Sequence, residues 1–233
     1  LFNKTKISIS NDETRHYLNG IYLHKIKLEN KSFLCGVATD SHRLSSSSLE
    51  IDPKINIEPI ILPKKTIFQL IFLLEQSSGI IKISNNKSKI KFEINGGVLI
   101  SKVIDGRFPD YSKVIPKNND KILQIKLDEF RNSIERVATV SSDRTKGLKM
   151  NISKDVVQLS VNNPNSGEGI ENINAKFNSN DLNISFNSRY LTDIASQIEN
   201  EFIVINLKDA SSPVLINDFS DKNSFYVVMP MKI

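Results

Sequence analysis

The stretch VATDSHRL, residues 37–44, brings together side chains that can do chemistry. Asp40, Ser41 and His42 are the residue types of a hydrolase with a serine nucleophile, a histidine base and an orienting carboxylate. Such a triad needs groups that converge from separate elements, whereas adjacent residues of an extended chain point to opposite faces. We therefore do not expect an active site formed by these adjacent residues. A hydrolase centred on His42 is kept only as an alternative. The structural alternative is a turn in which Asp40 caps backbone amides and Arg43 pairs with a carboxylate.

Metal and cofactor chemistry has little support in the sequence. The other two histidines, His16 and His24, offer no HxxxH or HxH spacing, and the single cysteine, Cys35, lies in an apolar run without a partner. A P-loop and a GxGxxG fingerprint are also missing from the sequence. We expect no metal, no cofactor and no catalytic residue.

Composition is that of a soluble globular protein. The chain has 233 residues, of which 39% are hydrophobic and 24% charged, so it can hold one large domain or two smaller ones. Its longest apolar runs fall short of a membrane span and its start lacks the shape of a signal peptide, so a cytoplasmic location without membrane contact is expected. The formal charge of +5 is a weak indication of a polyanionic partner.

Apolar periodicity predicts a mixed fold with more strands than helices. Alternating patterns indicate strands at 89–94, 156–161, 182–186, 201–207 and 225–231. Helical spacing occurs at 63–76, 127–140 and 188–199, with Pro63 suited to a first turn and Ser188 to an N-cap. The predicted class is α+β with antiparallel sheets.

The sequence contains an internal repeat. ISNDETRHYLNGIYL from Ile9 resembles VSSDRTKGLKMNI from Val140, and the helices near 63 and 187 are each followed by three strands. Two copies of one domain are expected, 1–118 and 119–233, with a boundary in the sequence PKNND. A full helix precedes the second repeated motif but only a short segment precedes the first. We therefore expect the chain to begin inside a helix, as a fragment that has lost its N-terminal part.

Two further stretches stand out. DGRFPDY, residues 105–111, suits a turn that Phe108 and Tyr111 anchor to a core. The end YVVMPMKI places flexible apolar groups at a chain terminus, which suits either a docking surface or a buried edge strand.

Four motifs in order, RHYLNGIYL, VATDSHRL, DGRFPDY and YVVMPMKI, closely resemble the bacterial sliding clamp family, the beta subunits of DNA polymerase III. The resemblance implies two sliding-clamp (DNA clamp) domains, the second and third of three, with antiparallel sheets outside and helices on the inner face. Two full-length subunits would close head to tail into a homodimer ring. For this fragment, ring closure is not expected.

The resemblance also implies a function. A clamp is a non-catalytic processivity factor that encircles double-stranded DNA without sequence preference. It would tether the DNA polymerase III catalytic subunit, the clamp loader, other polymerases and repair proteins through a short linear motif. Besides the hydrolase, the alternative is a nucleic-acid-binding repeat protein that forms no ring.

Two sets of site residues follow from the resemblance. The DNA-binding candidates are Arg15, His16, Tyr17, Lys64, Lys65, Arg131, Arg136 and Lys146. The peptide-binding groove candidates are Leu18, Thr39, Ser41, His42, Arg43, Leu44, Pro109, Lys113, Val114, Thr145, Asn187, Tyr190, Pro213, Val227, Val228, Met229, Pro230, Met231, Lys232 and Ile233. The sequence departs from the family pattern at four places: Ser41 for a common glycine, Lys113 for a frequent arginine, Thr145 for an occasional aromatic, and Lys232 with Ile233 for an Arg-Leu ending.

Overall fold

The chain folds into two compact units. The computed structural model describes residues 1–141 and 146–232, and contacts divide it into unit 1, Leu1–Asp110, and unit 2, Tyr111–Ile233. The expected boundary near residue 118 lies further along the chain. Within unit 2, the side-chain amide of Asn119 donates to the carbonyls of Asn206 and Pro213 at 2.8 and 3.0 Å.

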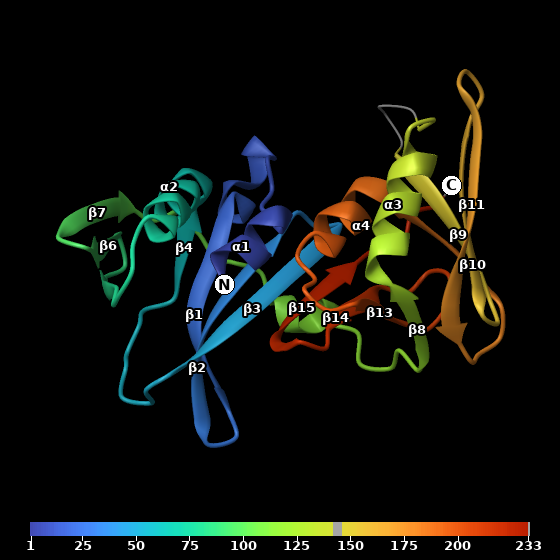
Figure 1. Cartoon of the computed structure of the whole chain (residues 1–233). Helices are drawn as coiled ribbons and strands as arrows, with labels where there is room; N and C mark the ends of the chain where they lie inside the picture. The colour runs from blue at the N-terminus through green and yellow to red at the C-terminus, as the bar shows by residue number, and fades with distance from the viewer. Residues whose placement is uncertain (142–145, 233) are drawn as a thin grey trace. The chain divides into compact units, whose positions relative to one another are not determined.

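Unit 1 holds two antiparallel sheets. Its elements are α1 Phe2–Thr5, η1 Lys6–Ser8, η2 Glu13–Leu18, β1 Gly20–Leu28, β2 Lys31–Thr39, β3 Arg43–Ile51, β4 Ile60–Pro63, α2 Lys64–Glu75, β5 Lys82–Asn85, β6 Lys89–Ile94 and β7 Gly97–Lys102. One sheet has the order β3-β2-β1-β4 and the other β5-β6-β7 (Figure 1). An isolated bridge between Ile61 and Ile104 links them.

Unit 2 holds one continuous antiparallel sheet. Its elements are η3 Tyr111–Val114, β8 Lys121–Lys126, α3 Leu127–Ala138, β9 Gly147–Ser153, β10 Val156–Asn163, β11 Gly167–Phe177, β12 Leu182–Asn187, α4 Ser188–Ala195, β13 Phe202–Leu207, β14 Val214–Asp218 and β15 Asp221–Val228. The strand order is β12-β9-β10-β11-β8-β13-β14-β15. Helix α3 packs on β8, β10 and β11 and against α4, as Figure 1 shows.

The topology confirms the repeat. In each unit three strands form a meander, β1 to β3 or β9 to β11, and the next strand, β4 or β12, pairs with the first of them. A helix, α2 or α4, and a second meander follow. The difference is β8, which pairs with both β11 and β13 and joins the two meanders of unit 2. Among the described residues of unit 1, no strand joins β3 to β5.

Two helix starts, those of α2 and α4, differ from expectation by one residue. Pro63 is the N-cap of α2 in extended conformation rather than a first-turn residue. Ser188 is the first residue of α4, and the cap is Asn187, whose side-chain oxygen accepts the amide of Arg189 at 3.0 Å. Asparagine is as good an N-cap as serine, so the sequence pattern alone fits both positions.

Two predicted elements end three or four residues earlier than expected. Helix α4 ends at Ala195, and β15 stops at Val228 instead of continuing to Met231. Pro230 cannot donate a backbone hydrogen bond to a neighbouring strand, which explains the early end of the strand. In the part of the chain that is described, no helix has the length and apolar character needed to cross a membrane.

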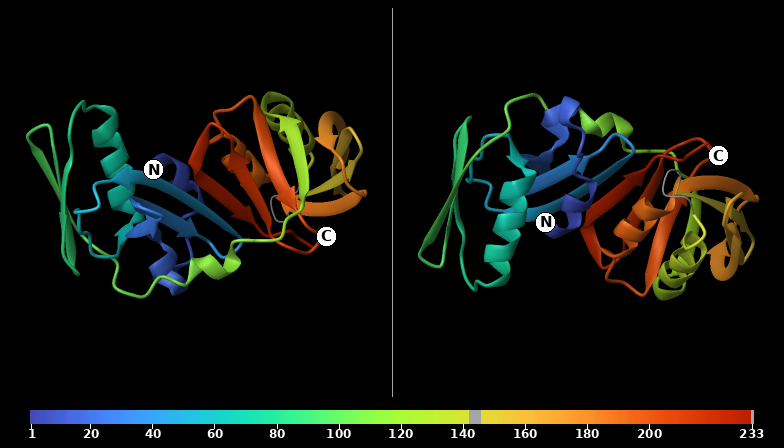
Figure 2. Two further views of the ribbon diagram at one scale, coloured as in Figure 1. Left: turned by 90° about the horizontal axis from the view of Figure 1, so that it is seen from below. Right: turned by 90° about the horizontal axis from the view of Figure 1, so that it is seen from above.

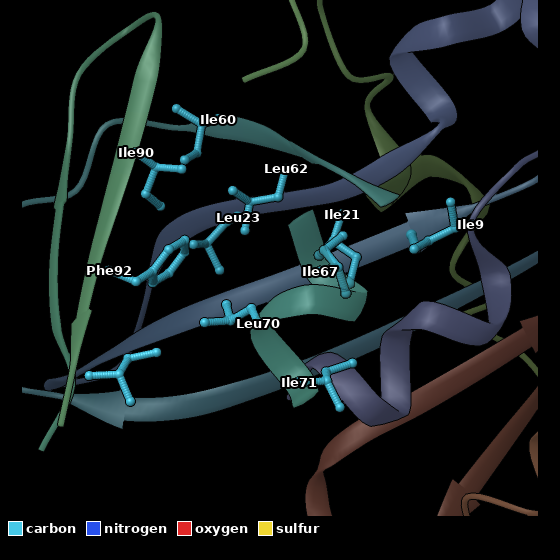
Figure 3. Close-up of a cluster of buried hydrophobic side chains, with 12 residues drawn as sticks. Ile9, Ile21, Leu23, Ile60, Leu62, Ile67, Leu70, Ile71, Ile90 and Phe92 are labelled. Atoms are coloured by element: carbon cyan, nitrogen blue, oxygen red, sulfur yellow. The ribbon is translucent and has the colours of Figure 1, made fainter. Parts of the chain in front are cut away.

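The core of unit 1 lies between α2 and the strands. The helix buries one stripe, Ile67, Leu70 and Ile71, at the 3–4 residue spacing of an amphipathic helix. Figure 3 shows this stripe beside Leu23 of β1 and Phe92 of β6. In both views of Figure 2, α2 runs beside the β6–β7 hairpin. The helix thus unites strands from both sheets in one core.

Truncation of Phe92, whose side chain is fully buried, tests this core. Phe92→Ala is expected to lower the free energy of unfolding of unit 1 by about 3–5 kcal/mol, because it removes buried apolar contacts and leaves a cavity. Denaturant unfolding measures the change. Phe72→Ala is the matched control, since that ring on α2 is 53% exposed and its loss should cost less than about 1 kcal/mol. Equal losses in the two variants would contradict this core.

Candidate functional site

The turn between β2 and β3 is built around one carboxylate. Asp40 accepts the backbone amides of His42 and Arg43 with Oδ1, at 2.9 and 3.0 Å, and the Nε of Arg43 with Oδ2 at 3.0 Å. The side chains of Asp40 and Arg43 are only 16% and 9% exposed. Thr39 closes the turn, because its hydroxyl donates to the carbonyl of Arg43 at 2.7 Å and accepts the amide of Ser41 at 3.2 Å.

This geometry does not support the hydrolase alternative. Both oxygens of Asp40 serve the backbone and Arg43, so the carboxylate holds the turn rather than orienting the His42 ring. His42 and Ser41 are exposed neighbours on the turn, and Ser41 Oγ accepts a hydrogen bond from an arginine. The structural alternative, in which Asp40 caps amides, is correct.

Arg15 connects the segment η2 to this turn. Its Nη1 donates to Ser41 Oγ at 2.5 Å and its Nε donates to Asp12 Oδ2 at 2.8 Å. Asp12 also accepts the backbone amide and hydroxyl of Thr14 with Oδ1, at 2.9 and 2.6 Å. These hydrogen bonds, first from Thr14 and then from Arg15, lower the pKa of the Asp12 carboxyl to about 2. The carboxylate is therefore charged at any physiological pH.

The loop DGRFPDY is anchored by stacked rings. Phe108 is buried and lies parallel to Tyr22 of β1, with ring centroids 4.9 Å apart, and Tyr22 stacks in turn on His24 at 4.4 Å. The ring of His16 reaches the carbonyl of Asp105 at 3.1 Å through Nε2. The predicted anchoring by Phe108 is confirmed, and it places Pro109 on an exposed stretch of the loop.

In unit 2 the chain end lies along β12. The backbone amide of Met231 donates to the carbonyl of Ser185 at 2.7 Å. Asn187 and Tyr190 follow Ser185 at the start of α4, so the apolar end and these two candidates belong to one region of unit 2. Pro213 precedes Val214, which pairs with Val228 at the end of β15.

The groove candidates differ in exposure. Leu18, Leu44, Val227 and Val228 are buried and can only support a groove from beneath. The exposed candidates are Ser41, His42, Pro109, Lys113, Val114, Met229 and Lys232. The half-buried ones are Thr39, Arg43, Asn187, Tyr190, Pro213, Pro230 and Met231. Thr145 and Ile233 lie outside the described residues. Residues 39–44 lie together at the turn of unit 1, and the chain end lies beside β12 in unit 2. The union of all the candidates in a single groove stays a prediction.

The first group of DNA candidates is engaged within unit 1. Arg15 is held by Asp12 and Ser41, and His16 is bonded to the loop at Asp105. Tyr17 is half-buried, with its Cβ 3.2 Å from the position that a Cβ on Gly106 would take. Gly106 has φ +140°, which favours glycine, so the loop approaches η2 closely at this point.

The lysines of α2 are more accessible. Lys65 is exposed, whereas Lys64 donates to Asn11 at 2.6 Å and has its Nζ 6.0 Å from the ring centroid of Phe68. A lysine ammonium has three N–H donors, so one hydrogen bond to Asn11 leaves others for a further partner.

The DNA-binding candidates of unit 2 differ in the contacts and burial that the structure gives them. Arg136 forms a two-pronged ion pair with Glu171 of β11, at 2.7 and 3.1 Å, and the hydrogen bond lowers the pKa of the Glu171 carboxyl. Arg131 on α3 is half-buried, and the carbonyl of Lys146 accepts the amide of Ser188 at 2.8 Å. Arg136 must leave Glu171 before its Nε and Nη2 can bind a phosphate together.

Sequence reasoning missed the link between Arg15 and Ser41. The Asp12–Arg15 spacing is visible in the sequence, but the partner hydroxyl lies 26 positions away and nothing in the local pattern marks it. The described residues contain no group of three or more His, Cys, Asp or Glu side chains able to hold a metal ion, and Cys35 is buried.

The fold and the two clusters define a class: a protein built from two copies of one α+β domain, with exposed apolar and polar groups at a rigid turn and at the chain end. Two family profiles match it. The DNA polymerase III beta subunit, central domain, covers residues 1–110, and the C-terminal domain of the same subunit covers residues 112–232. The chain belongs to the DNA polymerase III beta subunit family.

Individual relatives agree with the profiles. The chain is 36% identical over 234 residues to a beta sliding clamp of Caulobacter vibrioides and 30% identical over 233 residues to one of Escherichia coli. Each comparison covers 100% of this chain and 63% of the relative. The chain therefore spans less than two thirds of the length of these curated relatives.

Solved structures show the same fold. A sliding clamp of Bartonella birtlesii bound to griselimycin has a TM-score of 0.97 and 39% identity, over 100% of this chain and 63% of that one. A Caulobacter crescentus beta sliding clamp, with polyethylene glycol at the region assigned to beta-motif tethering, has a TM-score of 0.97 and 35% identity, over 100% and 62% of the two chains. The sequence-based fold class and family are confirmed.

Removal of the Asp40 carboxylate tests the turn. Asp40→Ala is expected to lower the free energy of unfolding of unit 1 by about 2–4 kcal/mol, because it removes the carboxylate that accepts two backbone amides and the Nε of Arg43 in a largely covered turn. Urea unfolding measures the loss. Asp52→Ala is the matched control: its carboxylate caps the amide of Lys54 at 2.8 Å on an exposed turn, and its loss should cost less than about 1 kcal/mol. A small, equal cost in both variants would refute the structural role of Asp40.

The stacked His24 predicts a pH dependence of stability. Burial lowers the pKa of His24, although hydrogen bonds from its ring to the backbone of Cys35 and Tyr22 oppose the effect. Below the unfolded value of about 6.5 the unfolded state binds a proton that the folded state does not, so stability falls as pH decreases from 7 to 5, by at most about 1.4 kcal/mol per pH unit. His24→Phe keeps a ring against Tyr22 and should flatten this slope. Thermal unfolding at several pH values measures it, and equal slopes in both proteins would contradict the assignment.

Proposed function

We propose that this chain acts as part of a DNA sliding clamp, the processivity factor of DNA polymerase III. One observation carries the proposal: two consecutive domains of that subunit match the chain in order, and the match extends to a TM-score of 0.97 over all of it. A ring is formed by complete domains, so a match over two whole domains supports this function more strongly than a match to one motif would. Since the chain spans 63% of its relatives, the ring is inferred from the family.

The proposed action on DNA is topological and non-catalytic. Duplex DNA passes through a ring of such domains, and a few basic groups on the inner helices contact phosphates without reading sequence. Weak contacts allow sliding, and few of them give a shallow dependence on salt. Among the candidates, Lys65 is exposed and Lys64 retains donors for a phosphate, whereas Arg15 and Arg136 are held by carboxylates.

The proposed second activity is tethering of partner proteins. A short linear motif with apolar anchors would bind the clusters at the turn and at the chain end. The partners would be the polymerase III catalytic subunit, the clamp loader, other polymerases and repair proteins. Met229 is 39% exposed and offers a flexible apolar contact, while Arg43 is held rigidly by Asp40. We place the protein in the cytoplasm, where a bacterial replication complex meets its DNA.

Rigidity of the turn favours peptide binding. A ligand that meets a preformed surface does not have to order it, so less of the interaction free energy is lost on binding. Asp40 provides this order through four interactions within four residues, counting the bond from its own amide to the carbonyl of Arg43 at 3.3 Å.

Peptide titration tests the proposal. A fluorescent peptide with one Gln and two or three apolar anchors is expected to bind with a micromolar Kd, roughly −8 kcal/mol. Met231→Ala combined with Arg43→Ala should weaken binding by about tenfold or more, because it removes an apolar contact and a rigid polar one. Fluorescence anisotropy measures both values.

The control for this titration is Lys31→Ala. Lys31 pairs with Glu50 at 2.7 Å on the exposed far end of the β2–β3 hairpin, so its loss should leave the Kd unchanged. Absence of binding by the unsubstituted chain, or an equal effect of Lys31→Ala, would sink the proposed tethering site.

A further inference from the structure

Ser41 has a backbone conformation that serine rarely adopts. Its φ is +78°, in the left-handed region where glycine is at ease and where asparagine and aspartate are tolerated better than other residues. Two of the other non-glycine residues with positive φ, Asn95 and Asp155, have such short polar side chains. Serine in this backbone conformation costs conformational energy, and the conformation persists only where surrounding contacts hold it in place.

The surroundings of Ser41 supply a specific partner. Arg15 donates Nη1 to Ser41 Oγ at 2.5 Å and Nε to Asp12 Oδ2 at 2.8 Å, so one guanidinium spans the two residues. Asp12 is fixed in turn, since it accepts two bonds from Thr14 and its amide donates to the hydroxyl of Ser10 at 3.1 Å. Ser10 is buried, which connects the chain of contacts to the core.

We propose that Arg15 is a positioning residue of the tethering site and that the Asp12–Arg15–Ser41 bridge holds the 40–43 turn in its binding shape. This inference rests on the proposed function, because it assigns a supporting role at the same site. A planar guanidinium donates from Nε and Nη1 in two fixed directions and so holds both acceptors at once, which the single ammonium group of lysine does not reproduce. The bridge acts on Ser41, and Asp40 independently acts on His42 and Arg43.

The bridge adds a second role to Arg15. The sequence placed this residue among the DNA contacts, and two of its donors are engaged within unit 1. A guanidinium has five N–H donors, so these two bonds leave others for a phosphate. The place of Arg15 among the DNA contacts therefore stays a prediction, separate from its role at the turn.

The test uses four variants of the chain: Arg15→Ala, Arg15→Lys, Ser41→Ala and Ser41→Asn. Loss of the bridge in the first three is expected to weaken peptide binding about three- to tenfold, the effect of one typical hydrogen bond. Ser41→Asn should bind within about twofold of the unsubstituted chain, because asparagine tolerates positive φ and offers an oxygen to Arg15. In the double variant Arg15→Ala with Ser41→Asn, the near-normal affinity of Ser41→Asn should be lost, because the asparagine oxygen no longer has Arg15 as its donor.

Amide hydrogen exchange of residues 41–43 without peptide provides an independent readout. Exchange should accelerate in Arg15→Ala and Ser41→Ala and stay slow in Ser41→Asn, while Lys31→Ala serves again as the control. Unchanged exchange and unchanged affinity in Arg15→Ala would overturn the bridge. If the unsubstituted chain binds no peptide but Arg15→Ala still accelerates exchange, the bridge stands and the tethering function falls.

Discussion

A single carboxylate, that of Asp40, determines the shape of the site in unit 1. A charge that is 16% exposed must be satisfied by protein groups, and here two amides and one guanidinium satisfy it. These partners lie within three residues of it, so the chain has to reverse tightly between β2 and β3. The reversal sets the register of the hairpin, in which Thr39 pairs with Leu44, and it leaves Ser41 and His42 exposed at its tip. The remaining contacts of the turn, including that of Arg15, build on this reversal.

The sequence predicts elements well where periodicity and composition act locally. Strand β6 was expected at its observed residues, and α3 and α2 to within two residues, since each follows one apolar pattern from end to end. Helix starts were less certain because Asn187 and Ser188 are both good caps. The internal repeat gave the two-domain arrangement because corresponding helices are followed by corresponding strands.

The site was predictable only in part. The residue types of the turn indicated a cap by Asp40, and the resemblance supplied the groove candidates. Burial of Leu44, Val227 and Val228 depends on packing between elements far apart in the chain, as does the bond from Arg15 to Ser41. Nothing in a local pattern distinguishes an arginine that is held by a distant hydroxyl from one that meets phosphate.

The difference between the two sheet arrangements has a consequence for local unfolding. In unit 2, β8 pairs along its whole length with β13 and at residues 123–125 with β11, so opening one meander means breaking a shared strand. In unit 1, the meander of β5 to β7 is linked to the other sheet by the bridge at Ile61 and Ile104 and by packing on α2. A shared strand therefore couples the two meanders of unit 2, whereas in unit 1 the coupling between the two sheets depends on the side chains that both pack against α2.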